Sequence, residues 1–178
     1  MEEVILVNEA DIAVGTMEKI EAHQKALLHR AFSVFIFDTQ GRMLLQRRAD
    51  GKYHSPGLWT NACCSHPRPG EDTEAAAIRR LHEELGFTTP LTRLFSFTYR
   101  SEYDNGLTEF EFDHVFVGHY DISDDVSAGA AIHPNPEEVS DYCYRSMEDI
   151  RTGLQADPAS YTTWFHLAFP MVNEKYKG

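Results

Sequence analysis

The stretch LWTNACCSHPRPGEDTEAAAIRRLHEELGF, residues 58–87, joins a loop of chemically reactive side chains to a helical pattern. Asp72 or Thr73 stands where a helix N-cap is expected, and Gly86 stands just past the last turn, where a left-handed residue is common. Four apolar residues between them recur at helical spacing and form one stripe: Ala77, Ile78, Leu81 and Leu85. The stretch therefore predicts an amphipathic helix that packs on a core and follows a functional loop.

Apolar segments on both sides of this helix predict β-strands. Residues 31–38, AFSVFIFD, are followed by the turn signal TQG and by RMLLQRR at residues 42–48, a pattern that predicts a hairpin with a buried first strand. Residues 91–103 and 107–120 predict two further strands separated by the turn DNG. The order of strands, helix and strands predicts an α/β fold with a mixed sheet covered by helices.

The last third of the sequence predicts a loop and two helices. Residues 121–138 are polar and rich in Gly and Pro, which is typical of a loop. Ser146 with Asp149 resembles a capping box that opens a short helix. Residues 160–176 have a helical pattern, in which Pro170 is expected to kink or divide the helix.

Length and composition indicate a globular protein. The 178 residues favour a single domain over residues 1–178, and the hydrophobic share of 42% is enough for a large core. No apolar run approaches the roughly 18 residues that span a membrane, and the acidic start MEEVILVNEA does not resemble a secretory signal. Cys63, Cys64 and Cys143 are an odd number of cysteines, which favours free thiols in a reducing compartment. We therefore expect a cytoplasmic protein without a membrane partner.

Charge is distributed unevenly along the chain. The net charge of -12 disfavours binding to nucleic acid or to an anionic membrane. Residues 19–52 nevertheless hold seven Lys and Arg against three acids, whereas the chain after Arg100 holds four bases against fifteen acids. The early segment fits a site for a small anion, and a chance cluster of solvated charges is the alternative.

The loop NACCSHP carries a candidate nucleophile or proton carrier. Cys64 and His66 lie between a tryptophan and the expected helix N-terminus, which can favour the thiolate form of a nearby cysteine. A cysteine is often merely a small buried apolar residue. A structural zinc site is disfavoured because no second Cys or His pair stands at ligand spacing.

Imidazoles and carboxylates elsewhere suggest a metal site. His23, His29 and His66 offer ring nitrogens, and Glu109 and Glu111 share one strand face because they are two residues apart. Each residue alone fits an ordinary solvated or core position. However, the strand around the two glutamates is strongly apolar, and a buried carboxylate without a partner is costly. If that face is buried, the glutamates need cations.

The helical segment resembles a known motif. Arg79 with Glu83, and Arg80 with Glu84, are i, i+4 pairs of the kind that form surface salt bridges. The segment resembles the Nudix box, G-x5-E-x7-R-E-U-x-E-E-x-G-U, in which U is aliphatic or aromatic. The matching residues are Glu71, Arg79, Leu81, Glu83, Glu84, Gly86 and Phe87. The pattern departs at Ser65, which replaces a Gly, and at Arg80, which replaces a metal-binding Glu of the hydrolases. Loss of that carboxylate argues against pyrophosphate hydrolysis.

A fuller resemblance is to the type 1 isopentenyl-diphosphate isomerases, relatives of the Nudix hydrolases. Similar segments occur in the family's order from about Val4 to Trp164: LHRAFSVFIF, LLQRRA, SPGLWTNACCSHPRPGE, RRLHEELG, YRSEYDNGLTEFEFDHVF and TTW. The resemblance implies a Nudix-like mixed β-sheet flanked by α-helices. It also implies an isomerase of isoprenoid biosynthesis that interconverts isopentenyl and dimethylallyl diphosphate by a 1,3-allylic proton shift.

The resemblance further assigns catalytic roles. Cys64 corresponds to the catalytic thiol, and Glu111 to a catalytic carboxylate on the opposite side of the substrate. Tyr99 is expected to form a hydrogen bond near Glu111. Trp164 is expected to place its ring against the isoprenoid, where an indole face can stabilise a developing carbocation.

Cation and anion sites are implied in the same way. A divalent metal, Mn2+, Zn2+ or Mg2+, is expected at a site formed by His23, His29, His66, Glu109 and Glu111. Glu84 is expected to hold a Mg2+ that the substrate diphosphate also binds. The expected contacts to the phosphates are Lys19, Arg48, Lys52 and Arg80. Arg80 would then be a diphosphate contact in place of a hydrolytic metal ligand.

Two other functions remain open at this point. A Nudix pyrophosphohydrolase of a nucleoside diphosphate derivative would release phosphate, and Arg80 argues against it. A non-catalytic ligand-binding module would tolerate replacement of Cys64. The expected partner is a small-molecule isoprenoid diphosphate, with no nucleic acid or membrane, and the expected state is a monomer or weak dimer.

Overall fold

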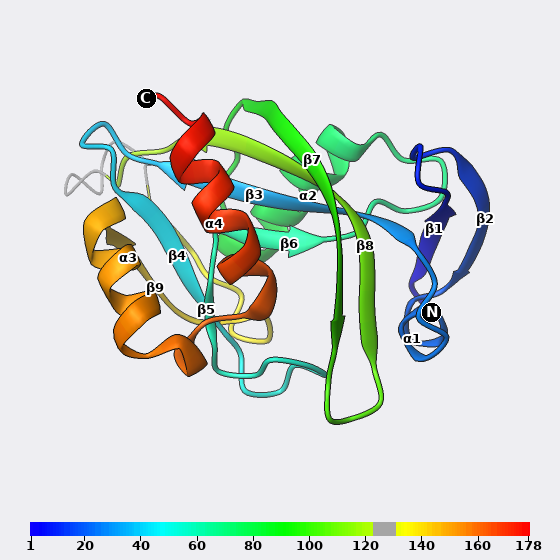
Figure 1. The fold of residues 1–178 in the computed structure, drawn as a ribbon. Coiled ribbons are helices and arrows are strands. Elements are labelled where there is room, and N and C mark those ends of the chain that lie inside the picture. Colours follow the sequence, from blue (N-terminus) through cyan, green and yellow to red (C-terminus); the bar gives the residue numbers. More distant parts are fainter. Residues whose placement is uncertain (123–130) are drawn as a thin grey trace.

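The computed structural model describes residues 1–122 and 131–178. Its strands are β1 (Glu3–Val7), β2 (Ala13–Glu18), β3 (His29–Phe37), β4 (Met43–Arg48), β5 (Trp59–Thr60), β6 (Cys63–Ser65), β7 (Leu91–Glu102), β8 (Thr108–His119) and β9 (Val139–Arg145). Its helices are α1 (Lys19–Gln24), α2 (Thr73–Leu85), α3 (Met147–Ala156), the short 3-10 helix η2 (Pro158–Ser160) and α4 (Thr163–Lys175). All nine strands belong to one mixed sheet (Figure 1).

Strand β3 is the centre of this sheet. Along one edge it pairs in parallel with β8 over its whole length, from His29 opposite Glu111 to Phe37 opposite His119. Along the other edge it meets β1, then β6 and finally β4, each through a short antiparallel contact. Strand β6 therefore enters the sheet between β3 and β4.

The predicted hairpin of residues 31–48 is present only at its turn. The Asp38 carboxylate accepts hydrogen bonds from the backbone N–H groups of Gln40 and Arg42, which fixes the turn. Beyond it, Phe37 and Met43 are the pair recorded between the two strands. The strands then separate because β6 takes the edge of β3, while β4 pairs with β5 and β9.

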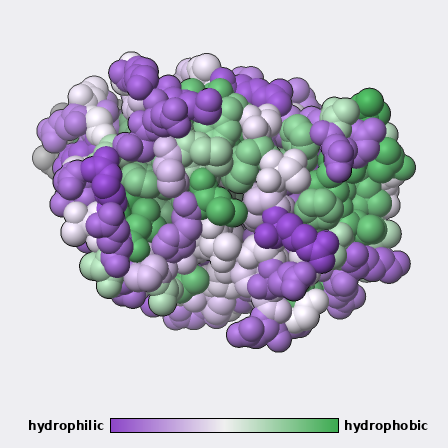
Figure 2. Space-filling model, in the orientation of Figure 1, coloured by the Kyte–Doolittle hydropathy of each residue, from purple (hydrophilic) through white to green (hydrophobic). Residues whose placement is uncertain are grey.

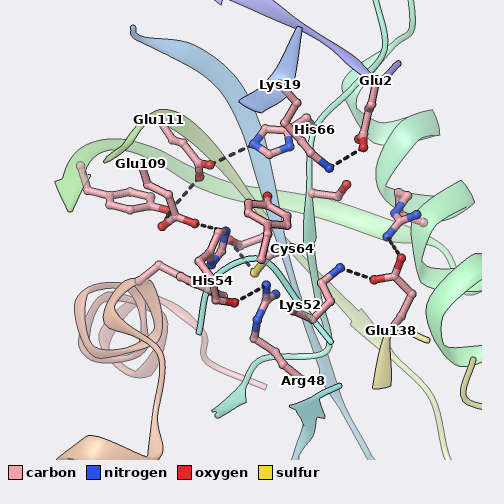
Figure 3. A pocket seen from close by; sticks show the side chains of 16 residues that line it. Glu2, Lys19, Arg48, Lys52, His54, Cys64, His66, Glu109, Glu111 and Glu138 are labelled. Carbon is pink, nitrogen blue, oxygen red and sulfur yellow. Dashed lines mark hydrogen bonds and ion pairs between the residues drawn. The ribbon is translucent and has the colours of Figure 1, made fainter. Parts of the chain in front are cut away.

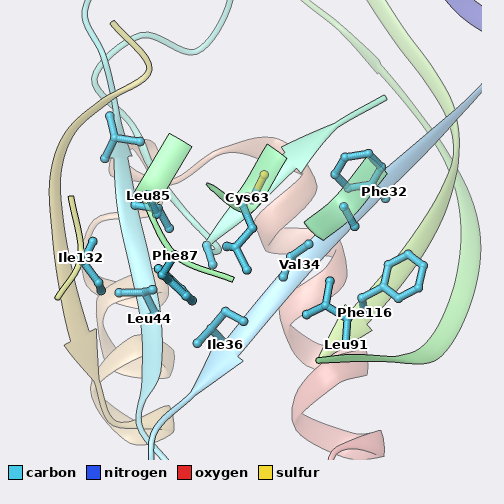
Figure 4. Close-up of a cluster of buried hydrophobic side chains, with 14 of the residues drawn as sticks. Phe32, Val34, Ile36, Leu44, Cys63, Leu85, Phe87, Leu91, Phe116 and Ile132 are labelled. Atoms are coloured by element: carbon cyan, nitrogen blue, oxygen red, sulfur yellow. The ribbon is translucent and has the colours of Figure 1, made fainter. Parts of the chain in front are cut away.

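Helices cover both faces of the sheet, as the α/β prediction requires. Alternate side chains of β3 point to opposite faces. Phe32, Val34 and Ile36 pack with Leu81 and Leu85 of α2 in one buried cluster (Figure 4). On the other face, side chains of the sheet pack against helices α3 and α4 through Phe35, Phe37, Leu45, Ile150, Phe165 and Phe169. The expected mixed sheet flanked by α-helices is confirmed.

Local capping signals place the helices accurately. The Asp72 side chain accepts a hydrogen bond from the N–H of Ala75, and Gly86 ends α2 with a φ of 76°. Ser146 caps α3 by accepting from the N–H of Asp149 at 3.1 Å. These three positions behave as predicted because capping depends on residues only a few positions apart.

Of the two outcomes predicted at Pro170, a kink or a division of the helix, the structure excludes division. The helix runs continuously from Thr163 to Lys175 with Pro170 inside it, so it is not divided there. Pro170 is exposed, whereas the buried face of the helix holds Phe165 and Phe169. Burial of those aromatic rings offsets the backbone hydrogen bond that a proline cannot donate.

The strands β7 and β8 form the long hairpin predicted around the turn DNG, with Glu102 paired to Thr108. The loop predicted for residues 121–138 is confirmed at residues 121–122 and 131–138, which contain no helix or strand, and residues 123–130 lie outside the described part. In the described part of the chain, no helix is both long and apolar enough to cross a membrane.

On the face seen in Figure 1, polar side chains are interspersed with apolar ones, which show across the middle and at the end where β1 and β2 lie (Figure 2). Ile12 and Val14 are the exposed apolar side chains there, at 60% and 65% exposure.

Candidate active site

One pocket collects most of the chemically reactive side chains (Figure 3). It opens beside the centre of the sheet, and its walls come from the chain start, α1, β3, β4, the loop before β5, β6, α2, β7, β8, the turn before β9 and α4. The lining residues are Glu2, Lys19, Ser33, Arg48, Lys52, Tyr53, His54, Cys64, Ser65, His66, Arg80, Tyr99, Glu109, Glu111, Glu138 and Trp164. Residues from the whole length of the chain therefore meet in one site.

Three predicted histidines converge at one end of this pocket. The ring centroid of His29 lies 4.9 Å from that of His23 and 5.0 Å from that of His66. The Nδ1 atom of His23 lies 2.6 Å from the Lys19 carbonyl oxygen, and that of His29 lies 2.8 Å from the Leu27 carbonyl oxygen. Because a carbonyl only accepts hydrogen bonds, Nδ1 is the protonated atom in both rings. In the neutral form of each ring the lone pair is then on Nε2, as in metal-binding histidines.

The two predicted glutamates of β8 complete the cluster. His66 Nε2 lies 2.9 Å from Glu111 Oε1, and His29 Nε2 lies 3.5 Å from the same oxygen. The Tyr99 hydroxyl donates to Glu111 Oε2 at 2.7 Å and is 3.0 Å from Glu109 Oε2. Both carboxylates are almost fully buried, with exposures of 3% for Glu109 and 6% for Glu111. The face that carries the two glutamates is therefore buried, and the partners found there are imidazoles and a tyrosine hydroxyl. The cation that a buried carboxylate pair calls for stays a prediction.

The cluster is suited to a divalent metal ion. Ligand atoms of His23, His29, His66 and Glu111 all lie within 4.8 Å of one another, and so do those of His23, His54 and Glu109. In the described structure, the buried Nε2 atoms of His23 and His29 have no hydrogen-bond partner. Burial of such atoms is costly unless something binds them, and imidazole with carboxylate suits several divalent ions.

Electrostatics favour the same interpretation. Burial lowers the pKa of His23 to about 4, so its imidazole is neutral at neutral pH. Burial also lowers the pKa of His66, against the opposing effect of Glu111. For Glu111, burial alone would raise the pKa, but interactions with His29 and His66 outweigh it and hold the pKa well below its usual range. For His29, burial alone would lower the pKa, but the hydrogen bond and charge of Glu111 outweigh it and raise the pKa. The neutral imidazole of His23 and the ionised carboxylate of Glu111 are the forms that bind metal.

Cys64 lies on the other edge of β3 from Glu111. It pairs with Ser33 through β6, whereas Glu111 pairs with His29 through β8. The Cys64 thiol donates to Asn61 Oδ1 at 3.1 Å, and its Sγ lies 3.4 Å from Ser33 Oγ. Burial raises the pKa of the Cys64 thiol, so it is protonated at neutral pH. The thiol and the carboxylate therefore approach the pocket from opposite sides of one strand.

Asn61 holds this thiol in place. It is fully buried, and its side-chain N–H groups donate to the backbone carbonyls of Val34 at 2.9 Å and Cys63 at 3.0 Å. These two bonds turn the amide oxygen toward Cys64. The rotamer of the thiol is thereby set by the backbone of β3 and β6.

Trp164 lies in the pocket with a cation already against it. The guanidinium carbon of Arg48 is 5.2 Å from the centroid of the Trp164 ring, which is a cation–π contact. Both side chains are buried, and Arg48 Nε has no hydrogen-bond partner in the described structure. The indole face can thus hold positive charge, and Arg48 has a donor free for an anion.

The remaining predicted phosphate contacts also line the pocket, each beside an acid. Lys19 Nζ lies 2.5 Å from Glu2 Oε2. Lys52 forms an ion pair with Glu138, and Arg80 Nη2 lies 3.4 Å from Glu138 Oε1. All four predicted cations therefore reach one pocket, as a polyanion site requires.

Glu84 occupies a different position from the other predicted metal ligands. It is buried under Arg80, which donates to Glu84 Oε1 at 2.6 Å, and it accepts from Gln46 at 2.9 Å. It does not belong to the His/Glu cluster or to the pocket lining given above. The Arg80–Glu84 pair is also not a simple surface salt bridge, since Glu84 is 5% exposed.

The sequence analysis did not predict six residues of the pocket lining, which are Glu2, Ser33, Tyr53, His54, Ser65 and Glu138. His54 Nε2 lies 2.9 Å from Glu109 Oε1, and its ring stacks on Tyr103 with centroids 5.2 Å apart. Glu2 and Glu138 are the acids that pair with the predicted cations. His54 could have been found from its place two residues after Lys52, a predicted phosphate contact. No local sequence pattern indicates that Glu2 and Glu138 belong to the site.

Comparisons with known proteins identify the family of this chain and confirm the expected Nudix-like fold. The family model described as NUDIX domain matches residues 27–165. A Pectobacterium atrosepticum protein named Isopentenyl-diphosphate Delta-isomerase is 48% identical over 175 residues, which cover 98% of this chain and 93% of that protein. A protein of the same name from Serratia proteamaculans is also 48% identical, over 92% of this chain and 87% of its own length.

Solved structures agree on the fold alone. A crystal structure from Deinococcus radiodurans superimposes with a TM-score of 0.75 at 22% identity, covering 99% of this chain and all of that one. A MutT protein from Methanosarcina mazei superimposes with a TM-score of 0.65 at 20% identity, covering 85% and 96% of the two chains.

Proposed function

Because the chain belongs to the NUDIX domain family and, within it, to the isopentenyl-diphosphate Delta-isomerases, we propose that it interconverts isopentenyl diphosphate and dimethylallyl diphosphate. The observation that carries this proposal is the approach of Cys64 and Glu111 to one pocket from opposite edges of β3.

The reaction moves one proton on and another off. A C–H bond forms at the terminal alkene carbon, the neighbouring carbon becomes a tertiary cation, and a C–H bond breaks at the next carbon to give the new double bond. One group must supply a proton while the other removes one. Cys64 is protonated and can donate a proton, whereas Glu111 is ionised and can accept one. In the reverse direction their tasks are exchanged.

The surroundings of this pair support the two roles. Asn61 directs the thiol, and Tyr99 holds the Glu111 carboxylate by a hydrogen bond of 2.7 Å. Trp164 offers an aromatic face to the cation, an interaction of about 0.5–2 kcal/mol that is stronger when water is excluded. Pairing of Arg48 with a diphosphate would neutralise its charge beside that cation.

Metal ions belong to the same proposal. We assign a divalent ion, Mn2+, Zn2+ or Mg2+, to His23, His29, His66, Glu109 and Glu111. When bound, it supplies fixed positive charge beside the reacting carboxylate. We assign Mg2+ with the substrate diphosphate to Glu84. Since Arg80 now pairs with Glu84, that arrangement requires Arg80 to turn toward the diphosphate.

We propose a single catalytic domain over residues 1–178 that acts in the cytoplasm on a small isoprenoid diphosphate. It would work as a monomer or weak dimer, without nucleic acid or membrane partners.

Proton NMR in deuterated water tests this function directly. Isopentenyl diphosphate is incubated with Mg2+ and the parent protein, Cys64→Ala, or Cys143→Ala. Cys143 is a half-buried thiol in β9 outside the pocket and is the matched control. We expect dimethylallyl diphosphate carrying deuterium from the parent and from Cys143→Ala, and no turnover by Cys64→Ala. Unchanged substrate with the parent would refute the proposal, and phosphate release from a nucleoside diphosphate derivative would then favour the hydrolase.

A further inference from the structure

Two of the cations assigned to the diphosphate share a carboxylate that the proposed mechanism does not use. Lys52 forms an ion pair with Glu138, and Arg80 Nη2 lies 3.4 Å from Glu138 Oε1 (Figure 3). All three side chains line the pocket. The Glu138 carboxylate therefore lies where two cations meet, which is a position that suits a phosphate group.

Glu138 is held there by its backbone. Its N–H donates to the Asn135 carbonyl at 3.0 Å, and its carbonyl accepts from the N–H of Ala49 at 2.9 Å. The next residue, Val139, starts β9 and pairs with Arg48 of β4. The side chain is consequently delivered to the anion site by the sheet.

The charge on this side chain is maintained. Burial alone would raise the pKa of Glu138, but Lys52 and Arg80 outweigh burial and hold the pKa below its usual range. The side chain is 22% exposed, so the pair is only partly open to water. Glu138 is thus an anion at neutral pH in contact with two cations.

A similar arrangement occurs at Lys19. Its Nζ lies 2.5 Å from Glu2 Oε2, and the backbone N–H of Lys19 donates to the Glu2 carbonyl at 2.8 Å. Glu2 is more exposed, at 44% of its side chain, so it is the weaker of the two counter-ions. Among the residues that the structure describes, Arg48 has no carboxylate partner.

We propose that Glu138 is a built-in counter-ion that occupies part of the diphosphate position in the empty protein and is displaced by the ligand. This inference rests on the proposed function only in taking Lys52 and Arg80 as diphosphate contacts. Displacement weakens binding, because the ligand must replace existing ion pairs rather than meet free cations. Substrate and product of the proposed reaction carry the same diphosphate, so a returning carboxylate favours product release.

Binding of inorganic pyrophosphate tests this role without any chemistry on carbon. Its affinity is measured by titration calorimetry at fixed free Mg2+ for the metal-loaded parent, Glu138→Gln and Glu137→Gln. Glu137 is the exposed neighbour, so its replacement removes the same charge without removing either pocket contact. Exposed ion pairs change equilibria by up to about fivefold. A partly buried carboxylate that contacts two cations is expected to change them by about tenfold.

We therefore expect Glu138→Gln to bind pyrophosphate about tenfold more tightly than the parent, and Glu137→Gln to stay within about twofold. The difference should shrink in about 1 M NaCl, where the Debye length falls to about 3 Å. With isopentenyl diphosphate, KM should fall in Glu138→Gln, and kcat should not rise. Glu138→Ala must show the same tightening, which guards against a glutamine that keeps both hydrogen bonds.

Equal or weaker pyrophosphate binding by both Glu138 variants would overturn the inference. Thermal unfolding of each variant confirms that the folded protein is being compared. If Glu138→Gln binds pyrophosphate more tightly while the parent does not isomerise isopentenyl diphosphate, the counter-ion role of Glu138 is supported and the proposed function is refuted. If the parent isomerises isopentenyl diphosphate and neither Glu138 variant binds pyrophosphate more tightly, only the counter-ion role of Glu138 is refuted.

Discussion

Replacement of His23 by alanine should separate metal binding from ordinary packing. His23 is fully buried, with Nδ1 fixed by the Lys19 carbonyl and Nε2 left without a partner in the described structure. In the metal-free protein, His23→Ala loses one hydrogen bond and some packing but also removes an unpaired buried nitrogen. In the metal-loaded protein it additionally loses a ligand. The informative quantity is therefore the stabilisation that the metal provides, measured within each variant.

The size of this effect follows from linkage. At a free metal concentration of 100 times Kd, binding adds about 2.7 kcal/mol to the free energy of unfolding. Loss of one ligand from the five-residue cluster should raise Kd by at least about 100-fold, since changes in supporting residues alone reach that range. At the same metal concentration the variant then gains only about 0.4 kcal/mol. For a chain of this length, the lost 2.3 kcal/mol corresponds to a reduction of about 5–9 °C in the metal-induced rise of Tm.

Thermal unfolding of each protein with Mn2+ and with a chelator measures this difference. His114→Ala is the matched control, because His114 is a buried histidine whose Nε2 faces Asp11 Oδ2 at 2.9 Å, away from the cluster. His114→Ala should lower Tm equally with and without metal, so its metal-induced rise should equal that of the parent. A full metal-induced rise in His23→Ala would refute the assignment of His23 as a ligand.

Three further predictions concern the helix α2 and its ends. Arg80→Glu should weaken binding of isopentenyl diphosphate by about 10-fold or more at the same Mg2+ concentration, because it replaces a pocket cation by an anion; unchanged affinity in calorimetry would exclude Arg80 as a diphosphate contact. Asp72→Ala should lower the free energy of unfolding by about 1 kcal/mol, since the first turn loses its side-chain cap, and urea denaturation with no change would count against that cap. Gly86→Ala should lower the free energy of unfolding by about 1–3 kcal/mol more than Gly106→Ala does. Both glycines have positive φ, but a Cβ at Gly86 would lie 2.8 Å from His133 Cβ, whereas a Cβ at Gly106 would meet nothing within 4 Å. Equal destabilisation by the two substitutions would show that His133 moves away to accommodate the added Cβ.

The resemblance of the sequence motifs to a known family predicted much of the site. The motif around Cys64 and the paired glutamates of β8 pointed to the residues that meet in the pocket, and Lys19, Arg48, Lys52 and Arg80 all line it. His23 joins His29 and His66, although it comes from the separate helix α1. Glu84 remains a prediction, since in the structure its carboxylate is engaged by Arg80 and Gln46.

The sequence by itself determined the local elements of this protein. The caps of α2 and α3 and the hairpin of β7 and β8 depend on residues within a few positions of one another, and periodicity or turn chemistry over that range is visible in a single sequence. The family motif added the identities of the reactive residues.

Only the tertiary structure decided which polar and charged side chains pair with one another. His54 meets Glu109, and Glu138 meets Lys52, across 55 and 86 positions of the chain, because the sheet order and register bring their elements together. The separation of β3 from β4 likewise arises from competition with β6 for one strand edge. Such pairings depend on hydrogen bonds between distant strands, which leave no periodic trace in the sequence.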